Sequence, residues 1–217
     1  MKKLILATSI ATLLSPAAMA TEYFVGAGVG YHTAGAIIED SDNGRNELKD
    51  NTVAYSIRAG AYIQENHRIT ATANFVGEGH LYGTSEPIQD GETAYGDISF
   101  EQNEFLVSYD YMHELNDKFS LLGGATVGSV KNKIHAKATA SNTGPLTVSM
   151  SGSEQDFVYG AQGGVQYKLT PTISADLQYR YMSSSSEKLA VIGNQGGEVY
   201  FKIPEYSEIT FNIDFRF

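Results

Sequence analysis

The chain of 217 residues contains no cysteine and no tryptophan, and only 18% of its residues are charged. Without cysteine it can form no disulfide, no thiolate metal site and no cysteine nucleophile. Long hydrophobic runs are also missing. Beyond the N-terminus no apolar stretch reaches the roughly 18 residues that a membrane-spanning helix requires, so such a helix is excluded from the body of the chain.

The first twenty residues have the three parts of a secretory signal peptide. Lys2 and Lys3 form a charged start, Leu4–Leu14 is a short apolar stretch, and Ala18-Met19-Ala20 is a cleavage site of the A-x-A type. We expect cleavage between Ala20 and Thr21, which divides the chain into a signal peptide (1–20) and a single mature domain (21–217).

Positive charge is scarce in the mature domain. The full chain has 15 basic and 25 acidic residues, and loss of the two lysines with the signal peptide changes the net charge from −10 to −12. Nucleic-acid binding depends on neutralising phosphates with basic side chains. The charge balance therefore argues against a nucleic-acid partner.

The dominant pattern in the sequence is an alternation of apolar and polar residues. It is strictest in Ser207–Phe217, where every second residue from Ile209 onward is large and apolar. A period of two predicts a β-strand with one apolar and one polar face, and about nine residues suffice for a tilted strand to cross a bilayer. Similar alternation begins near Tyr23, Thr52, Ile69, Phe105, Phe119, Phe157 and Ile173.

Connections of two lengths alternate along the chain. Short turns are predicted at Glu65–His67, Leu115–Lys118 and Thr170–Pro171, and long loops at Gly35–Asn51, Gly83–Asp97, Ala140–Gly152 and Met182–Pro204. An even number of antiparallel strands with short turns at one end and long loops at the other is typical of outer-membrane barrels. The prediction is an all-β, closed antiparallel transmembrane barrel of about eight strands, with short periplasmic turns and four longer extracellular loops.

Charged residues on the polar faces distinguish this barrel from a soluble one, in which apolar side chains fill the interior. The charges lie in the spanning parts of strands, where an Arg or Lys facing the hydrocarbon would cost about 2–4 kcal/mol. We therefore expect them in the barrel lumen, as paired groups that fill a narrow interior; a narrow ion pathway is the alternative. The expected lumen charge network consists of Arg58, Glu104, Asp110, Asp176, Arg180, Asp214 and Arg216.

Both ends of the mature chain resemble a known family. Tyr23–Tyr31 is similar to the first strand of the small outer-membrane β-barrel superfamily, of the opacity/NspA, OmpX and OmpA barrel-domain type. Ile213, Phe215 and Phe217 resemble the last-strand signal that such proteins present to the barrel-assembly machinery. The resemblance implies the outer membrane of a Gram-negative bacterium, with outer-membrane lipid and lipopolysaccharide around the barrel.

No catalytic, cofactor-binding or metal site is predicted. Gly26, Gly28 and Gly30 do not make a dinucleotide fingerprint, because position 31 is tyrosine and no helix follows. The five histidines show no metal-ligand spacing. His80 or His135 could still meet a serine or a carboxylate across strands, which leaves a lipid A-modifying enzyme as an alternative.

The leading functional hypothesis is a non-enzymatic outer-membrane protein, envelope-structural or interacting with surfaces. Its acidic loops would contact a host or cell-surface ligand or lipopolysaccharide, because exposed loops on a rigid scaffold commonly carry binding. A narrow porin-like channel for ions or small solutes is the alternative, and a lipid A-modifying enzyme is a third.

Overall fold

Ten β-strands make up the regular structure of the computed structural model. It describes residues 20–40, 45–64, 66–88, 92–140, 146–185, 190–194, 197–202 and 205–217. The predicted signal peptide up to Met19 lies outside these residues. The strands are β1 (Ala20–Asp40), β2 (Arg45–Ile63), β3 (His67–Ile88), β4 (Glu92–Glu114), β5 (Phe119–Ala140), β6 (Leu146–Lys168), β7 (Ile173–Ser184), β8 (Ala190–Asn194), β9 (Gly197–Lys202) and β10 (Glu205–Arg216).

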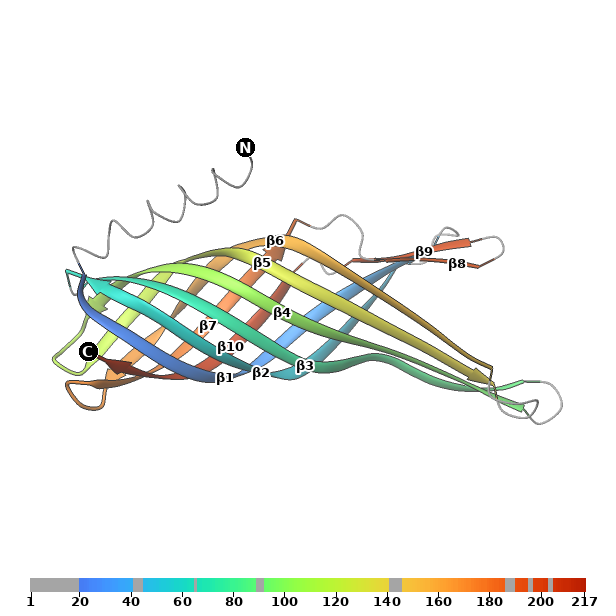
Figure 1. The fold of residues 1–217 in the computed structure, drawn as a ribbon, viewed down its shortest axis with the longest axis horizontal. Coiled ribbons are helices and arrows are strands. Elements are labelled where there is room, and N and C mark those ends of the chain that lie inside the picture. Colours follow the sequence, from blue (N-terminus) through green and yellow to red (C-terminus); the bar gives the residue numbers. More distant parts are fainter. Residues whose placement is uncertain are drawn as a thin grey trace.

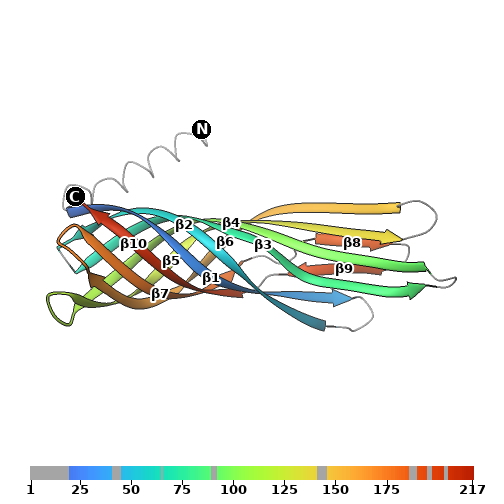
Figure 2. The same cartoon turned by 90° about the horizontal axis from the view of Figure 1, so that it is seen from below.

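Eight of these strands close into a barrel (Figure 1). Neighbours in sequence pair antiparallel from β1 to β7, β10 pairs with β7, and β10 also pairs with β1 from Phe24↔Arg216 to Ala34↔Tyr206. The strands wind around the barrel with a strong tilt, as Figures 1 and 2 show. The predicted closed antiparallel barrel of eight strands is therefore confirmed.

The three short turns occur where the sequence predicts them. Gln64 has φ 50° in the turn between β2 and β3, the left-handed conformation that tight reversals use. In the turn between β4 and β5, the side-chain oxygen of Asn116 accepts hydrogen bonds from the backbone of Lys118 and Phe119. Thr170 does the same for Ile173 before β7. These turns and the C-terminus lie at one end of the barrel, called here the short-turn end.

Strands continue into the segments predicted as long loops, so the predicted loop bounds are wrong. The β1–β2 pairing continues to Glu39↔Arg45, the β3–β4 pairing to Ile88↔Glu92, and the β5–β6 pairing to Ala140↔Leu146. The extensions of β1 to β4 alternate only weakly, so their apolar pattern does not show that these strands continue. Leu146–Met150 at the start of β6 does alternate, but the Ser, Thr and Gly residues around it predict a loop. The extended hairpins project from the barrel opposite the short-turn end (Figure 2).

The fourth predicted loop, 182–204, contains a separate hairpin. β8 pairs with β9 from Ala190↔Phe201 to Asn194↔Gly197. β9 in turn pairs with the far part of β1, from Ile37↔Lys202 to Asp40↔Val199. The small hairpin thus continues the sheet on β1 beyond the point where β10 leaves it.

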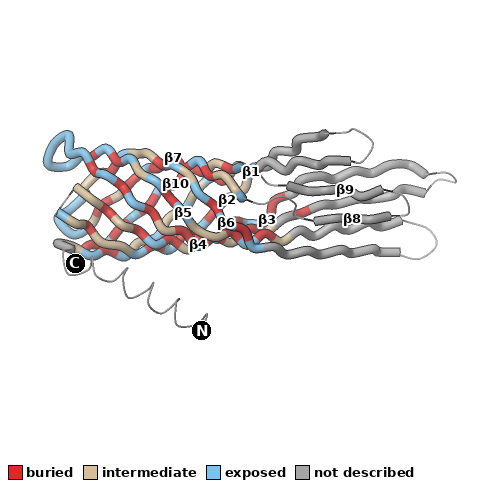
Figure 3. Tube along the Cα trace, turned by 90° about the horizontal axis from the view of Figure 1, so that it is seen from above, coloured by how far each residue is buried: buried red, intermediate tan, exposed pale blue. Residues whose placement is uncertain are grey.

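Buried and exposed residues alternate along the barrel strands (Figure 3). In β10, Phe211 and Ile213 are 48% and 49% exposed, whereas Asp214 is fully buried. The exposed wall is apolar, and Tyr23, Tyr31, Tyr55, Tyr111 and Tyr181 lie on it. No helix among the described residues is long and apolar enough to cross a bilayer. Apolar groups therefore face outward and ionic groups inward, as the sequence predicts.

Candidate functional site

The barrel interior gathers the charged residues of the chain's polar faces. Even-numbered residues of β2, β7 and β10 point inward because strand side chains alternate with period two. Arg58, Asp176 and Asp214 thereby come from three different strands to one level of the lumen. Each is at most 6% exposed.

Arg58 is the centre of this level. Its Nε and Nη2 each donate to a different oxygen of Asp214 at 2.7 Å. Its Nη1 donates to Asp176 Oδ1 at 3.3 Å, and its Nη2 also donates to Asp176 Oδ2. Because a guanidinium fork matches a carboxylate in geometry, this is a two-sided ionic contact with high directional specificity.

Arg68 extends the contact toward the opposite wall. It donates to Asp176 at 3.0 Å and to Asp110 at 2.9 Å. Gln162 donates to Asp110 at 2.5 Å and accepts from Arg180 at 3.0 Å. Thr126 on β5 donates to Gln162 at 2.8 Å. Every barrel strand except β1 therefore contributes to this set of contacts. We call it the central network; it consists of Arg58, Arg68, Asp110, Thr126, Gln162, Asp176, Arg180 and Asp214.

β1 contributes space to the central network. A Cβ atom placed on Gly26 would lie 2.1 Å from Asp214 Oδ1, and one on Gly28 would lie 2.0 Å from Asn212 Oδ1. Only glycine permits such an approach. The repeated glycines of the first strand therefore make room for the interior side chains of β10.

The structure separates the seven expected lumen charges into three groups. Arg58, Asp110, Asp176, Asp214 and, through Gln162, Arg180 belong to the central network. Glu104 lies in a different contact, where it accepts hydrogen bonds from Asn74 at 3.0 Å and Gln102 at 3.1 Å. Arg216 lies toward the short-turn end. Arg68 is not among the seven expected charges, although its even number matches the inward-facing residues of β3.

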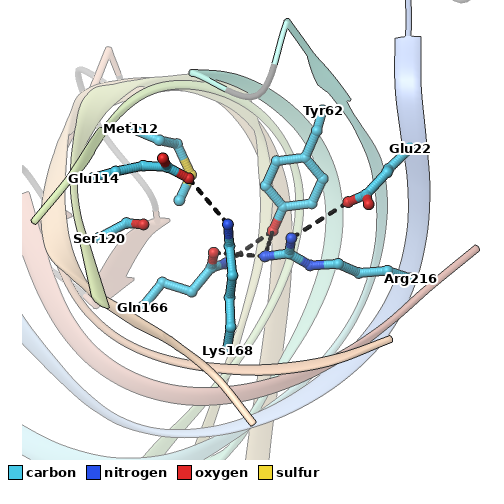
Figure 4. A pocket seen from close by; sticks show the side chains of 8 residues that line it. All are labelled: Glu22, Tyr62, Met112, Glu114, Ser120, Gln166, Lys168 and Arg216. Atoms are coloured by element: carbon cyan, nitrogen blue, oxygen red, sulfur yellow. Dashed lines mark hydrogen bonds and ion pairs between the residues drawn. The ribbon is translucent and has the colours of Figure 1, made fainter. Parts of the chain in front are cut away.

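A polar pocket of about 350 Å³ contains Arg216 (Figure 4). Arg216 donates to Gln166 at 2.7 Å, to Tyr62 at 3.2 Å and to Glu22 at 3.3 Å. Its guanidinium also lies 4.3 Å from the centre of the Tyr62 ring, a cation–π contact. On another wall, Lys168 donates to Glu114 at 3.0 Å. The pocket is lined by both signs of charge, each already paired.

An apolar cluster adjoins this pocket. Phe24, Tyr62, Met112 and Leu122 pack together, each at most 5% exposed. The rings of Phe24 and Tyr62 are 5.3 Å apart, and Arg58 lies 5.9 Å from the Phe24 ring. The interior thus changes from polar pocket to apolar cluster to central network along the barrel.

Three histidines have described side chains, and one of them, His32, is buried with its Nδ1 3.5 Å from Glu208 Oε2. His67 lies on the outer wall with Nδ1 2.6 Å from the Tyr109 hydroxyl, and His113 is exposed. The backbone register sets Ser99 opposite His80 on one side and His135 on the other. The side chains of His80 and His135 lie outside the described part of the structure. Within it, no three His, Cys, Asp or Glu residues gather as a metal site.

The three residues of the expected assembly signal lie on the outer wall at the barrel seam. Ile213, Phe215 and Phe217 are 49–67% exposed. Phe217 exchanges both backbone hydrogen bonds with Tyr23, at 2.9 and 3.0 Å. The positions expected at signal cleavage, Ala20 and Thr21, begin β1.

Comparison with known proteins matches the chain to one family model. The model described as "Outer membrane protein beta-barrel domain" matches residues 5–217. OprG from Pseudomonas aeruginosa is 11% identical, with 92% of this chain and 97% of that chain covered and a TM-score of 0.55. Neisserial surface protein A (NspA) is 17% identical (90% and 97% covered, TM-score 0.49). Ail of Yersinia pestis is 16% identical (89% and 98% covered, TM-score 0.45). No curated protein matches the chain.

Proposed function

The chain belongs to the outer membrane protein β-barrel domain family, and from this premise we propose that it is a non-enzymatic surface-interaction protein. In this proposal a closed barrel anchors rigid extracellular hairpins, which contact a host surface, another cell or lipopolysaccharide. The barrel-assembly machinery inserts it, and outer-membrane lipid surrounds its apolar wall. The short-turn end faces the periplasm.

The central network is the observation that carries the proposal. Arg58 and Arg68 connect β2 and β3 to β4, β7 and β10 across the lumen. An eight-stranded barrel has an interior that side chains can fill. Removing one partner of a buried ion pair is strongly unfavourable, by about 3–5 kcal/mol. Spontaneous separation of these ion pairs, which would open a path through the lumen, would therefore be rare. A plugged lumen leaves the extracellular hairpins as the surface on which function acts.

The length of the hairpins supports the same conclusion. β5 and β6 have 22 and 23 residues, whereas a strand crosses a bilayer in about 9–11 residues. About half of each strand therefore extends beyond the outer leaflet. A paired hairpin is pre-organised, so a ligand that binds it has less conformational entropy to remove than with an irregular loop.

Shortened hairpins test the proposal. Gly83 pairs with Asp97 and Lys133 pairs with Ser153, so residues 84–96 and 134–152 can each be replaced by Asn-Gly, the two-residue hairpin turn, without a change of register. The doubly shortened protein should keep its barrel, seen as β-sheet circular dichroism and heat-dependent gel mobility. It should lose binding to cultured epithelial cells and to immobilised lipopolysaccharide.

Arg180→Ala is the matched control for that experiment, because Arg180 lies in the lumen and its loss leaves the hairpins intact. It should bind like the wild type. Equal binding by the shortened protein and the wild type would refute the proposal.

A narrow channel is the second candidate, and the pocket beside Arg216 favours it. Its volume of about 350 Å³ makes room for water and small ions on the short-turn side of the apolar cluster. Planar-bilayer recording separates the two candidates. The surface-interaction proposal expects no reproducible steps, whereas single-channel steps that change with Arg180→Ala or Asp214→Ala would establish a channel.

A further inference from the structure

Two buried glutamates from opposite walls share one amide group on the hairpin side of the central network. Asn74 Nδ2 donates to Glu104 Oε2 at 3.0 Å and to Glu208 Oε2 at 2.7 Å. Glu104 and Glu208 are 4% and 2% exposed. Two carboxylates this close repel each other, and burial strengthens the repulsion because little water screens it.

The nearby positive charge is insufficient to balance the pair. Arg180 lies opposite Glu208 in the β7–β10 register, and its Nε donates to Gln162 in the central network. His32 Nδ1 lies 3.5 Å from Glu208 Oε2, and the Tyr206 ring packs on His32 at 4.9 Å between centroids. With a neutral histidine, one guanidinium faces two carboxylates and leaves one negative charge uncompensated.

Several acceptor atoms of the same cluster have no hydrogen-bond partner among the described residues. They are Asn74 Oδ1, Gln102 Oε1 and Glu208 Oε1, on side chains that are at most 2% exposed. Gln102 Nε2 donates to Glu104 Oε1 at 3.1 Å. The side-chain nitrogens of Asn74 and Gln102 both donate to carboxylates. Rotating either amide to give its oxygen another partner would therefore break those hydrogen bonds. A buried acceptor without a partner costs about 1–3 kcal/mol.

We infer that Glu104, Glu208, Asn74 and Gln102 form a binding site for one hard, oxygen-preferring metal cation of the calcium or sodium type. Such a cation supplies the missing positive charge and coordinates several acceptors together, whereas a proton completes only one. Carboxylate and amide oxygens are ligands that these cations prefer. A soft transition metal fits less well, because such metals prefer thiolate and imidazole ligands and the four proposed ligands offer only oxygen.

The bound cation would connect the two walls of the barrel. Asn74, Gln102 and Glu104 lie on β3 and β4, and Glu208 lies on β10. This level is where the long hairpins leave the barrel. The site goes beyond the proposed surface role and does not depend on it, because the cation stabilises the barrel whatever the hairpins contact.

Thermal unfolding of the full mature chain in detergent micelles tests the inference. The protein is stripped with EDTA and then melted in choline chloride, in NaCl, and in choline chloride with CaCl₂, at constant ionic strength and pH 7.5. Saturating cation should raise the melting temperature by about 2–4 °C in at least one of the two salts, because binding to the folded state alone stabilises it. Equilibrium dialysis against calcium provides the direct measurement for the divalent ion.

Three variants separate this site from the acidic outer surface. Glu208→Gln removes one of the two negative charges that the cation balances, and Gln102→Leu removes a proposed oxygen ligand; each should abolish the shift. Asp156→Asn is the control, because it removes another buried interior carboxylate, on β6. Within the described part of the chain, Asp156 has no contact with the proposed ligands. This variant should retain the shift. If Glu208→Gln does not fold, Gln102→Leu, which keeps both carboxylates, carries the comparison.

Three outcomes would overturn the inference. One is an absence of any shift in the wild type with either cation. Another is an equal shift in the wild type and in Gln102→Leu, which would locate the cation on the hairpins. The third is stabilisation only when the pH is lowered, which would assign the missing charge to a proton on His32 or on one of the glutamates.

Discussion

Replacing Arg58 with leucine should weaken the barrel more than any substitution on its outer wall. The guanidinium is buried and, among the described residues, gives Asp214 both of its side-chain hydrogen bonds. Asp176 also loses its contacts with Arg58 but keeps Arg68 at 3.0 Å and Asn212 at 2.9 Å. The variant therefore leaves one carboxylate, Asp214, buried without a cation.

The expected loss follows from that uncompensated charge. Removing one partner of a buried ion pair lowers the free energy of unfolding by about 3–5 kcal/mol. Each 1.4 kcal/mol is a factor of about ten, so the ratio of folded to unfolded protein should fall about 100- to 4,000-fold. An exposed ion pair would account for only about 0–1 kcal/mol.

Urea titration of the protein in lipid vesicles measures this loss, provided that the slope with denaturant is unchanged. The double variant Arg58→Leu with Asp214→Asn is the control, because the neutral amide removes the uncompensated charge and should recover much of the stability. A loss below about 1 kcal/mol for Arg58→Leu would refute the reasoning, since it would give the contact the weight of a surface pair. An unchanged deficit in the double variant would do the same.

Three further predictions concern other parts of the barrel. Gly26→Ala should reduce the folded fraction on heat-dependent gel mobility, because the added Cβ would lie 2.1 Å from Asp214 Oδ1; a normal folded fraction would show that β1 yields there. Deletion of Phe217 should slow insertion into vesicles, because its backbone pairs with Tyr23 at the seam; insertion at the wild-type rate would contradict this. Ser99→Ala should leave the mass spectrum of lipid A from expressing cells unchanged from that of wild-type and empty-vector cells, and any protein-dependent mass change would support the enzymatic alternative.

The interior of the barrel could be predicted where alternation was strict. The inward orientation of Asp214 and Arg216 follows from the alternation in β10, because shifting the strand by one residue would turn its apolar side chains to the wrong face. Arg68 and Glu208 also have even numbers and point inward, but each directly precedes the isoleucine at which the strict alternation begins, Ile69 or Ile209. A strand start defined by apolar residues therefore excluded both.

The pairing of the lumen charges could not be predicted from the sequence. Arg58 and Asp214 are 156 residues apart, and their contact depends on barrel closure and on the tilt of each strand. Whether a residue number is even or odd predicts that its side chain faces the lumen, but it does not predict the height along the barrel axis at which the side chain lies. For this reason one expected network became three separate groups, with Glu104 and Arg216 on opposite sides of the central network.

The seam between β1 and β10 has a consequence for how the protein reaches its native state. The two strands are the first and the last of the barrel, and each has an unpaired edge until the other arrives. Contacts that join distant parts of a chain form slowly because a long loop must close first. Exposed strand edges also promote aggregation in the meantime. Until both terminal strands are available, the incomplete barrel is therefore exposed to association with its own copies, and closing this junction should be a slow step of folding.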